Sequence, residues 1–349
     1  MKKKGLSAAL ILGSFLLFPP SLGAQGLDKI IEGAKKEGRV RLGITLRWEV
    51  AGKPSGKKLI EAFQARYPFV KVEFQRVGGT REREKVFTEI AAGKVSYDVT
   101  VMTVTQIPNV LKADIAEKVD WRSLGIQPQD IAPLGLGVNY QYVIFGITHN
   151  RKLVSDEVAH RMGWEDCADP KWKRRIAMND TPIHLEILWQ PHLWGKDKTL
   201  AHARKLAANQ TVFERSGEDA TGKVALGEYA MSCGDVHNNY LEQTIFKGAT
   251  TLGFALPDPV PSTSRAIVYI PRGAQYPNAA RLWILWSLSE EAQALLDAID
   301  FTGNPTVMAT AAGKMAKGKK IVLYEPEWQL KAQDIRKEIL EATGLPIVR

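Results

Sequence analysis

Short apolar runs alternate with amphipathic segments along most of this chain, and their spacing predicts strands and helices. Residues 27–37 carry apolar side chains at helical spacing and end at Gly38, which favours a helix. Residues 40–44 form the compact apolar run of a buried strand. Residues 59–63 return to helical spacing, and Tyr67–Pro68 ends that helix because the residue before a proline disfavours helical geometry.

The alternation continues through the first third of the chain. Residues 70–74 alternate as a strand does, residues 81–92 predict a charged helix closed by Gly93, and residues 98–102 predict another strand. This repeated order of strand, helix and strand indicates parallel βαβ units. The expected fold class is therefore α/β.

A second series begins with the β-rich run 142–148. Its further expected elements are a strand before the turn Asn179-Asp180-Thr181, helices at 200–208 and 222–226, and a strand at 229–233. Residues 256–261 read Leu-Pro-Asp-Pro-Val-Pro, where each proline lacks the amide hydrogen of a regular element. We expect this segment to cross stiffly between two lobes.

The first 24 residues have the order of a secretory signal peptide. Lys2–Lys4 precede the mostly apolar run 6–18, Pro19–Pro20 break it, and small residues follow up to Ala24. Cleavage is expected after Gly23 or Ala24, which predicts export to the periplasm. The alternative, a membrane anchor, is disfavoured because the run is shorter than the ~20 residues of a spanning helix.

Composition and charge narrow the class of protein. The chain has 349 residues, 45% hydrophobic and 24% charged, which suits a globular protein of two lobes. Its net charge of +9 includes three lysines of residues 1–24, and the remainder favours anionic partners without forming a nucleic-acid-binding face. Cys167 and Cys233 are expected as two separately buried thiols, although an oxidising compartment also permits a disulfide.

Patterns of the common enzymes are absent from the sequence. There is no G-x-S-x-G elbow, phosphate-binding loop, H-E-x-x-H or C-x-x-C motif, and no two histidines have the i, i+4 spacing of metal ligands on a helix. We therefore expect a protein without catalytic residues, cofactor or resident metal. Arg47 and Trp48 follow the strand 40–44 at its carboxyl end, where open α/β sheets bind ligands, so both are candidate ligand-binding residues.

Several stretches, taken in order, resemble the iron-type branch of the type 2 periplasmic binding proteins. The matching stretches are residues 27–38, Ala62-Phe63 with Tyr67-Pro68, Tyr97-Asp-Val99 with Gln106-Ile-Pro108, Trp164 to Lys173, and Tyr276 to Gln293. The resemblance implies a substrate-binding subunit of an ABC importer, which delivers a small solute to a membrane permease and is expected to be monomeric. It also implies two lobes that close over the solute: 25–140 plus 258–310, and 141–257, with a helical segment 311–349 packing across both.

Ferric binders of this family hold iron with two adjacent tyrosines, a histidine and a glutamate. Here the corresponding segment 234–240 has one tyrosine, Thr105 stands where an acid is expected, and Arg47 and Trp48 stand near the expected histidine. Ferric iron prefers anionic oxygen ligands, so this reading favours a small anion held by Arg47. Candidate hydrogen-bonding residues are Thr45, Thr103, Thr105, Asn179, Asp180, Thr181 and Asn238.

Two alternatives stay open at this point. Asp235 and His237 could form a site for a cation or a metal chelate, which keeps ferric iron among the candidates. The same bilobal fold could also carry an enzyme or a periplasmic sensor subunit, since fold does not determine function.

Overall fold

The computed structural model describes residues 23–47 and 55–344, and the side chains from Gly26 onward. Most of the expected signal peptide and Trp48 therefore lie outside the described residues. A first lobe is built on three parallel strands: β1 (Arg39–Ile44), β2 (Lys71–Arg76) and β3 (Val99–Met102). The helices that connect and flank them are α1 (Gly23–Glu37), α2 (Gly56–Arg66), α3 (Thr80–Ala91), η1 (Val104–Gln106) and α4 (Ile107–Ala113).

A second lobe repeats this plan with its own parallel strands: β5 (Ile176–Asn179), β6 (Val212–Glu214) and β7 (Met231–Val236). Its further elements are α5 (Asp156–His160), η4 (Trp164–Ala168), α6 (Ile183–Leu188), α7 (Gly195–Ala208), α8 (Gly217–Leu226), α9 (His237–Leu241), η6 (Glu242–Phe246) and β8 (Leu252–Ala255). Both βα series predicted from the apolar spacing are confirmed, with ends shifted by a few residues.

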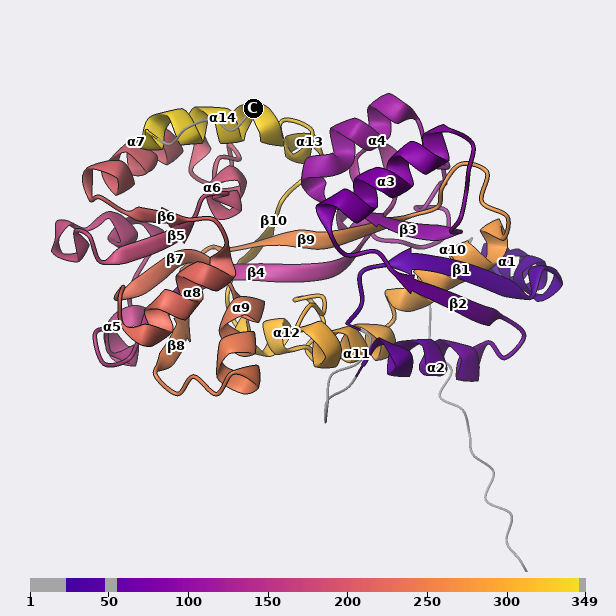
Figure 1. Ribbon diagram of the computed structural model, residues 1–349, viewed down its shortest axis with the longest axis horizontal. Helices are drawn as coiled ribbons and strands as arrows, with labels where there is room; N and C mark the ends of the chain where they lie inside the picture. Colours follow the sequence, from indigo (N-terminus) through magenta and orange to yellow (C-terminus); the bar gives the residue numbers. More distant parts are fainter. Residues whose placement is uncertain (1–22, 48–54, 345–349) are drawn as a thin grey trace, which may run out of the picture.

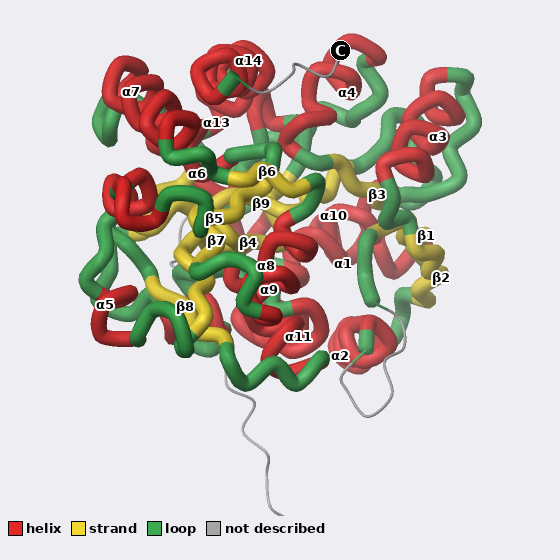
Figure 2. Tube along the Cα trace, turned by 60° about the vertical axis from the view of Figure 1, so that its left-hand side comes forward, coloured by secondary structure: helices red, strands yellow, loops and turns green. Residues whose placement is uncertain are grey.

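Two long strands join the lobes: β4 (Val138–Asn150) and β9 (Val260–Tyr269). They pair antiparallel with each other, so the sheet continues as β2-β1-β3-β9-β4-β7-β5-β6 with β8 beside β4 (Figure 1). Helices cover both faces of this strand layer (Figure 2). The crossing at residues 256–261 is more regular than expected, because β9 begins at Val260. Pro261 is accommodated as the second residue of the strand, near its start, where a missing amide hydrogen is tolerated.

Aromatic packing consolidates the first lobe. Phe63 of α2 lies 4.9 Å from Trp283 and 5.3 Å from Trp286 between ring centroids. Both tryptophans lie on α10 (Pro277–Ser287), which is followed by α11 (Glu290–Asp300). All three rings are buried, so both tryptophans contribute to the packing of the core.

The two cysteines are not separate thiols. Cys167 of η4 and Cys233 of β7 form a disulfide, with their Cα atoms 6.3 Å apart and both side chains buried. The expectation of two thiols was wrong because it depended on a distance that only the packing of η4 against β7 sets. The bridge closes a loop with a sequence separation of 66 residues.

The C-terminal segment returns to the crossing strands and contacts both lobes. Its elements are α12 (Ala311–Met315), β10 (Ile321–Leu323), α13 (Pro326–Gln329) and α14 (Ala332–Thr343). β10 pairs with β9, and α13 lies against the 3-10 turn η3 (Pro133–Gly135) of the first lobe. α14 packs on α6 and α7 and touches η1, and it lies across the top of the molecule in Figure 1. Within the described ranges, no helix has the length and apolarity to cross a membrane.

Candidate functional site

The carboxyl ends of the parallel strands form two faces on either side of β4. Thr45 follows β1, and its carbonyl oxygen accepts a hydrogen bond from Nε2 of Gln141 in β4 at 3.3 Å. Val236 ends β7 and pairs with Phe145 of β4. At ~3.3 Å per residue along β4, Gln141 and Phe145 are about 13 Å apart. A small solute placed between the faces would contact both lobes.

Two of the predicted residues meet on the face of the first lobe. The hydroxyl oxygens of Thr103 and Thr105 are 2.9 Å apart. Oε1 of Gln106 accepts hydrogen bonds from the amide and hydroxyl of Thr103 at 3.2 and 3.3 Å. Nε2 of Gln106 in turn donates to Glu84 at 2.8 Å, which fixes the orientation of the amide. The cluster follows directly from the turn that β3 makes into η1.

Arg83 joins this cluster, although sequence reasoning did not select it. Its Nε donates to Oε1 of Gln106 at 2.8 Å, and its Nη1 donates to the carbonyl of Gly78 at 2.6 Å. Among the described residues, no carboxylate oxygen lies within 4.0 Å of its guanidinium nitrogens, the limit for an ion pair. Burial lowers the pKa of Arg83, against the opposing effect of Glu84 and Glu82. A partly desolvated cation with no carboxylate in ion-pair contact favours an anionic ligand.

The sequence did carry a signal for Arg83. It lies in the first turn of α3, the helix that follows the carboxyl end of β2. The positive end of the helix dipole disfavours a cation at that position. An arginine there, next to a strand end, is therefore a candidate for binding an anion.

The face of the second lobe is a polar turn after β5. Oδ1 of Asn179 accepts the amide of Thr181 at 2.7 Å, and the hydroxyl of Thr181 donates to Asp180 at 3.2 Å. The start of α8 lies beside this turn, since a Cβ placed on Gly217 would be 3.7 Å from Nδ2 of Asn179. The amides at a helix N-terminus favour anions, but Glu218 in the first turn of α8 opposes this.

Asp235 is held inside the second lobe. Its carboxylate accepts hydrogen bonds from the hydroxyls of Thr148 and Thr221, from Nδ2 of Asn239 and from the amide of Val236, at 2.5 to 2.9 Å. Burial raises its pKa, against these four donors. We interpret Asp235 as a residue that ties β4, α8 and α9 together, since its acceptor positions are occupied by the protein.

His237 and Asn238 are also buried, at the start of α9. Nδ1 of His237 accepts the backbone amide of Ile144 in β4 at 3.3 Å, and burial lowers its pKa to about 4. The imidazole is thus neutral at pH 7 and anchors α9 to the crossing strand. Among the described residues, no three His, Cys, Asp or Glu side chains are grouped as metal ligands.

Arg47, the expected charge partner of the ligand, is engaged by the protein itself. Its Nη2 donates to Glu242 at 2.8 Å, and its Nε lies 3.0 Å from Oδ1 of Asp300. Thr45 also makes an internal contact, because its hydroxyl donates to the carbonyl of Val77 at 2.7 Å. Arg47 is therefore in direct contact with two carboxylates, whereas Glu84 and Glu82 act on Arg83 without forming an ion pair.

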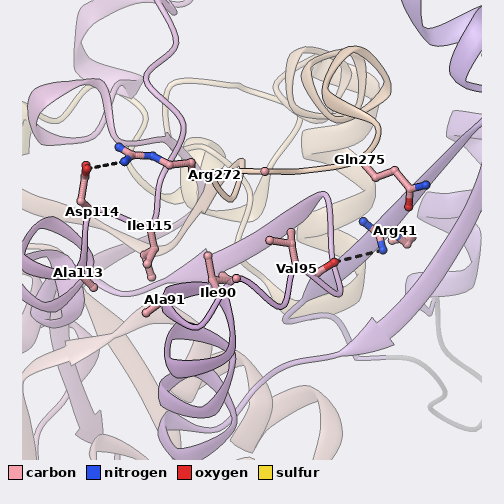
Figure 3. A pocket seen from close by; sticks show the side chains of 11 residues that line it. Arg41, Ile90, Ala91, Val95, Ala113, Asp114, Ile115, Arg272 and Gln275 are labelled. Atoms are coloured by element: carbon pink, nitrogen blue, oxygen red, sulfur yellow. Dashed lines mark hydrogen bonds and ion pairs between the residues drawn. The ribbon is translucent and has the colours of Figure 1, made fainter.

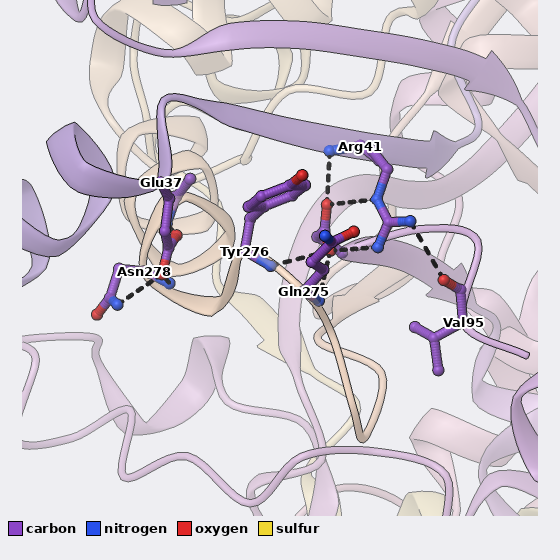
Figure 4. A network of polar contacts seen from close by, with 8 residues as sticks. Glu37, Arg41, Val95, Gln275, Tyr276 and Asn278 are labelled. Carbon is purple, nitrogen blue, oxygen red and sulfur yellow. Dashed lines mark hydrogen bonds and ion pairs between the residues drawn. The ribbon is translucent and has the colours of Figure 1, made fainter. Parts of the chain in front are cut away.

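A cavity of about 710 Å³ lies elsewhere, at the edge of the first lobe where the parallel strands begin (Figure 3). Arg41, Val95 and Gln275 line it. Two of these lining residues bind the fully buried Asp98, which accepts hydrogen bonds from the guanidinium of Arg41 and from the amides of Gln275 and Tyr276 (Figure 4). None of the predicted site residues lines this cavity, and open sheets bind ligands at the opposite strand ends.

Comparison with known proteins agrees with this architecture. Trichodesmium FutA in complex with iron and citrate superposes with a TM-score of 0.72 and 16% identity, covering 88% of this chain and 100% of that one. The open form of the ferric iron-binding protein A of Mannheimia haemolytica gives 0.70 and 16%, covering 87% and 98%. Iron-bound HitA of Pseudomonas aeruginosa gives 0.62 and 15%, covering 86% and 99%. These similarities establish the two-lobed periplasmic-binding-protein fold.

Sequence comparison gives the family. An uncharacterized protein of Haemophilus influenzae is 24% identical over 186 residues, which cover 51% of this chain and 53% of that protein. The chain thus spans about half the length of the curated relative that it matches. The family model of the bacterial extracellular solute-binding proteins matches residues 58–322, most of the chain. The protein is therefore a member of the bacterial extracellular solute-binding protein family.

Proposed function

We propose that this protein is the periplasmic substrate-binding subunit of an ABC importer, and that it captures a small anionic solute without catalysing a reaction. Family membership supports a binding role and a membrane permease as partner. The anionic ligand is supported by Arg83, a half-buried cation at the carboxyl ends of β2 and β3 that forms no ion pair with a described carboxylate. We place the lobe boundaries at 25–140 plus 258–310 and at 141–257.

The donors around Arg83 fit an anion with two or more oxygens. An arginine has five N–H groups, and here three contacts, to Gln106, Gly78 and Thr80, occupy one group each. The remaining N–H groups can donate to a carboxylate or phosphate-like group, and the hydroxyls of Thr103 and Thr105 can do so on giving up their present partners. In this proposal, Asn179 and Thr181 approach the ligand from the second lobe.

Closure of the lobes would complete the site. The crossing strands β4 and β9 connect the two faces, so a rotation about them changes the distance between the faces without breaking either core. A solute that contacts both faces binds the closed form better and shifts the population toward it.

Ferric iron is the second candidate, because three of the similar structures are of iron-binding proteins. Tyr240, the one tyrosine of the segment 234–240, stacks on Phe254 with centroids 5.3 Å apart. The described residues also lack a cluster of acidic and histidine ligands. A ferric ion carried by an organic anion would still suit Arg83, so iron with citrate belongs among the tested ligands.

The test is a binding titration of the refolded, ligand-stripped protein against carboxylates, phosphate esters, inorganic anions, ferric salts and ferric citrate. We expect one anionic class to bind and Arg83→Gln to weaken it more than tenfold, since a charged hydrogen bond contributes ~1.5–3 kcal/mol. Arg272→Gln is the matched control, because Arg272 lines the cavity at the far strand ends. Equal affinity in the Arg83 and Arg272 variants, or binding of free ferric salts alone, would refute the anionic site.

A further inference from the structure

Arg47 lies between two carboxylates that belong to different lobes. It follows β1 in the first lobe, and its Nη2 donates at 2.8 Å to Glu242, the first residue of η6 in the second lobe. Its Nε lies 3.0 Å from Asp300, the last residue of α11 in the first lobe. One guanidinium thus joins the strand-end loop of the first lobe to a helical segment of the second.

The contact is partly shielded from water. The side chains of Arg47, Glu242 and Asp300 are 28%, 18% and 9% exposed. The guanidinium carbon also lies 5.0 Å from the ring centroid of Phe246, one helical turn after Glu242. Partial burial strengthens both the ion pairs and the cation–π contact relative to exposed ones.

Asp300 also depends on Arg47 because of its position at the end of a helix. It ends α11, where the negative end of the helix dipole disfavours a carboxylate. Without Arg47, Asp300 and Glu242 would face each other with like charges across the boundary between the lobes. With Arg47 present, the ion pairs attract the two lobes to each other. Without Arg47, Glu242 and Asp300 would repel each other and push the lobes apart.

This arrangement differs from the other ion pairs that the structure describes. Between residues 25–140 or 258–310 on one side and 141–257 on the other, Arg47–Glu242 is the one pairing of a lysine or arginine with an acid. The C-terminal segment 311–349 adds its own bridges, to the second lobe as in Lys196–Glu338 and to the start of 258–310 as in Lys319–Asp258. Direct electrostatic attachment of one lobe to the other is concentrated at Arg47.

We propose that Arg47 is a positioning residue that latches the lobes together in the ligand-free protein and does not touch the solute. The proposal builds on the proposed solute-binding function but concerns the closure equilibrium, which exists without any ligand. The apparent dissociation constant equals the intrinsic one divided by the closed fraction. Loss of the latch therefore weakens binding of every solute by the same factor, whatever its charge.

The experiment measures the distance between spin labels in the ligand-free protein. Labels at Lys57→Cys in α2 and Leu226→Cys at the end of α8 report on the two lobes, and both positions are exposed. Arg47→Gln and Glu242→Gln should each shift the distribution to longer distances, Arg47→Gln more so. The double variant should open no further than Glu242→Gln, because Asp300 then faces no like charge across the boundary between the lobes. Raising NaCl from about 20 to about 500 mM should open the wild type and leave Glu242→Gln unchanged.

A control variant and a binding measurement complete the test. Arg161→Gln removes an exposed arginine of the second lobe, paired with Glu157, and should leave the distance unchanged. Solute affinity should fall by about threefold to tenfold in both Arg47→Gln and Glu242→Gln. Unchanged ligand-free distances in both variants would overturn the latch. So would tighter solute binding by Glu242→Gln together with lost binding by Arg47→Gln, which would make Arg47 a ligand-contacting group. Failure of the anionic ligand assignment would leave the distance measurements untouched.

Discussion

Arg336 of α14 and Glu186 of α6 form a two-point ion pair, at 2.6 Å from Nε to Oε1 and 3.1 Å from Nη2 to Oε2. The side chain of Glu186 is fully buried, and the hydroxyl of Tyr324 donates to it at 3.3 Å. The C-terminal segment is thereby attached to the interior of the second lobe through a paired charge.

Removal of Arg336 should destabilise the protein strongly. Arg336→Met leaves a buried carboxylate without its partner, which costs about 3–5 kcal/mol. Urea unfolding at pH 8 measures the loss. Lys337→Met on the same helix is the control, since Lys337 is exposed and lies 4.0 Å from Glu341, and it should change stability by less than about 0.5 kcal/mol.

The Arg336→Met variant should also depend on pH in a defined direction. Burial raises the pKa of Glu186, and Arg336 opposes this. Without the arginine, the folded state keeps the proton to higher pH than the unfolded state does. The stability of the variant should therefore fall, relative to the wild type, as the pH rises from 4.5 toward the raised pKa. Equal losses at pH 5 and pH 8 would contradict an uncompensated buried charge.

The disulfide should contribute stability through its long loop. For the sequence separation of 66 residues between Cys167 and Cys233, the loss on removing the bridge is about 4 kcal/mol in the loop-entropy model. The measurement compares urea unfolding of the wild type with that of the double alanine variant. Reductant should lower the stability of the wild type to that of the variant and have no effect on the variant itself.

The buried histidines predict that the folded protein loses stability in acid. Burial lowers the pKa of His184 to about 3, next to the ring of Trp164 at 5.2 Å. Below pH 6.5 the unfolded state binds a proton that the folded His184 does not, so stability is lost as pH falls. By pH 5 this single group costs about 2 kcal/mol relative to pH 7. In His184→Phe the difference in unfolding free energy between pH 7 and pH 5 should shrink by that amount, and an unchanged difference would assign the acid sensitivity to other groups.

Gly234 should tolerate no side chain. Its φ is +71°, and a Cβ there would lie 2.1 Å from the ring of His184. Gly38 has a similar φ of +68° with nothing within 4 Å of a Cβ, so it isolates the backbone effect. Gly38→Ala should cost about 1–2 kcal/mol, and Gly234→Ala a further 1–3 kcal/mol from overpacking. Thermal unfolding of both variants distinguishes the two contributions.

Local periodicity was sufficient for much of the fold. The apolar run 40–44 became β1 and the helical spacing of 81–92 became α3, with boundaries within one residue. Apolar spacing reports which side chains face a core, and that requirement acts within one element. β4 was underestimated as 142–148, because its ends pair with β9 and β8, which lie more than 100 residues away in the chain.

For the candidate site too, sequence reasoning covered relationships within one element and missed those between distant parts of the chain. Thr103 and Thr105 lie together because both belong to one turn after β3, and their contact with a ligand stays a prediction. Strand-end position selected Arg47, but Glu242 and Asp300 approach it from distant parts of the chain and balance its charge. Arg83 was passed over because its relation to Gln106 exists only when α3 is packed beside η1.

The sequence by itself determined the α/β class, the order of the βα units and the family resemblance, because these depend on local spacing and on motifs read in order. Only the tertiary structure decided that Cys167 and Cys233 are bonded, that the Asp235 carboxylate accepts hydrogen bonds from the protein interior, and that Arg83 contacts Gln106. Charge balance and bond formation depend on distances of a few ångströms between residues far apart in the chain. Such distances follow from the packing of whole elements, which no single stretch of sequence specifies.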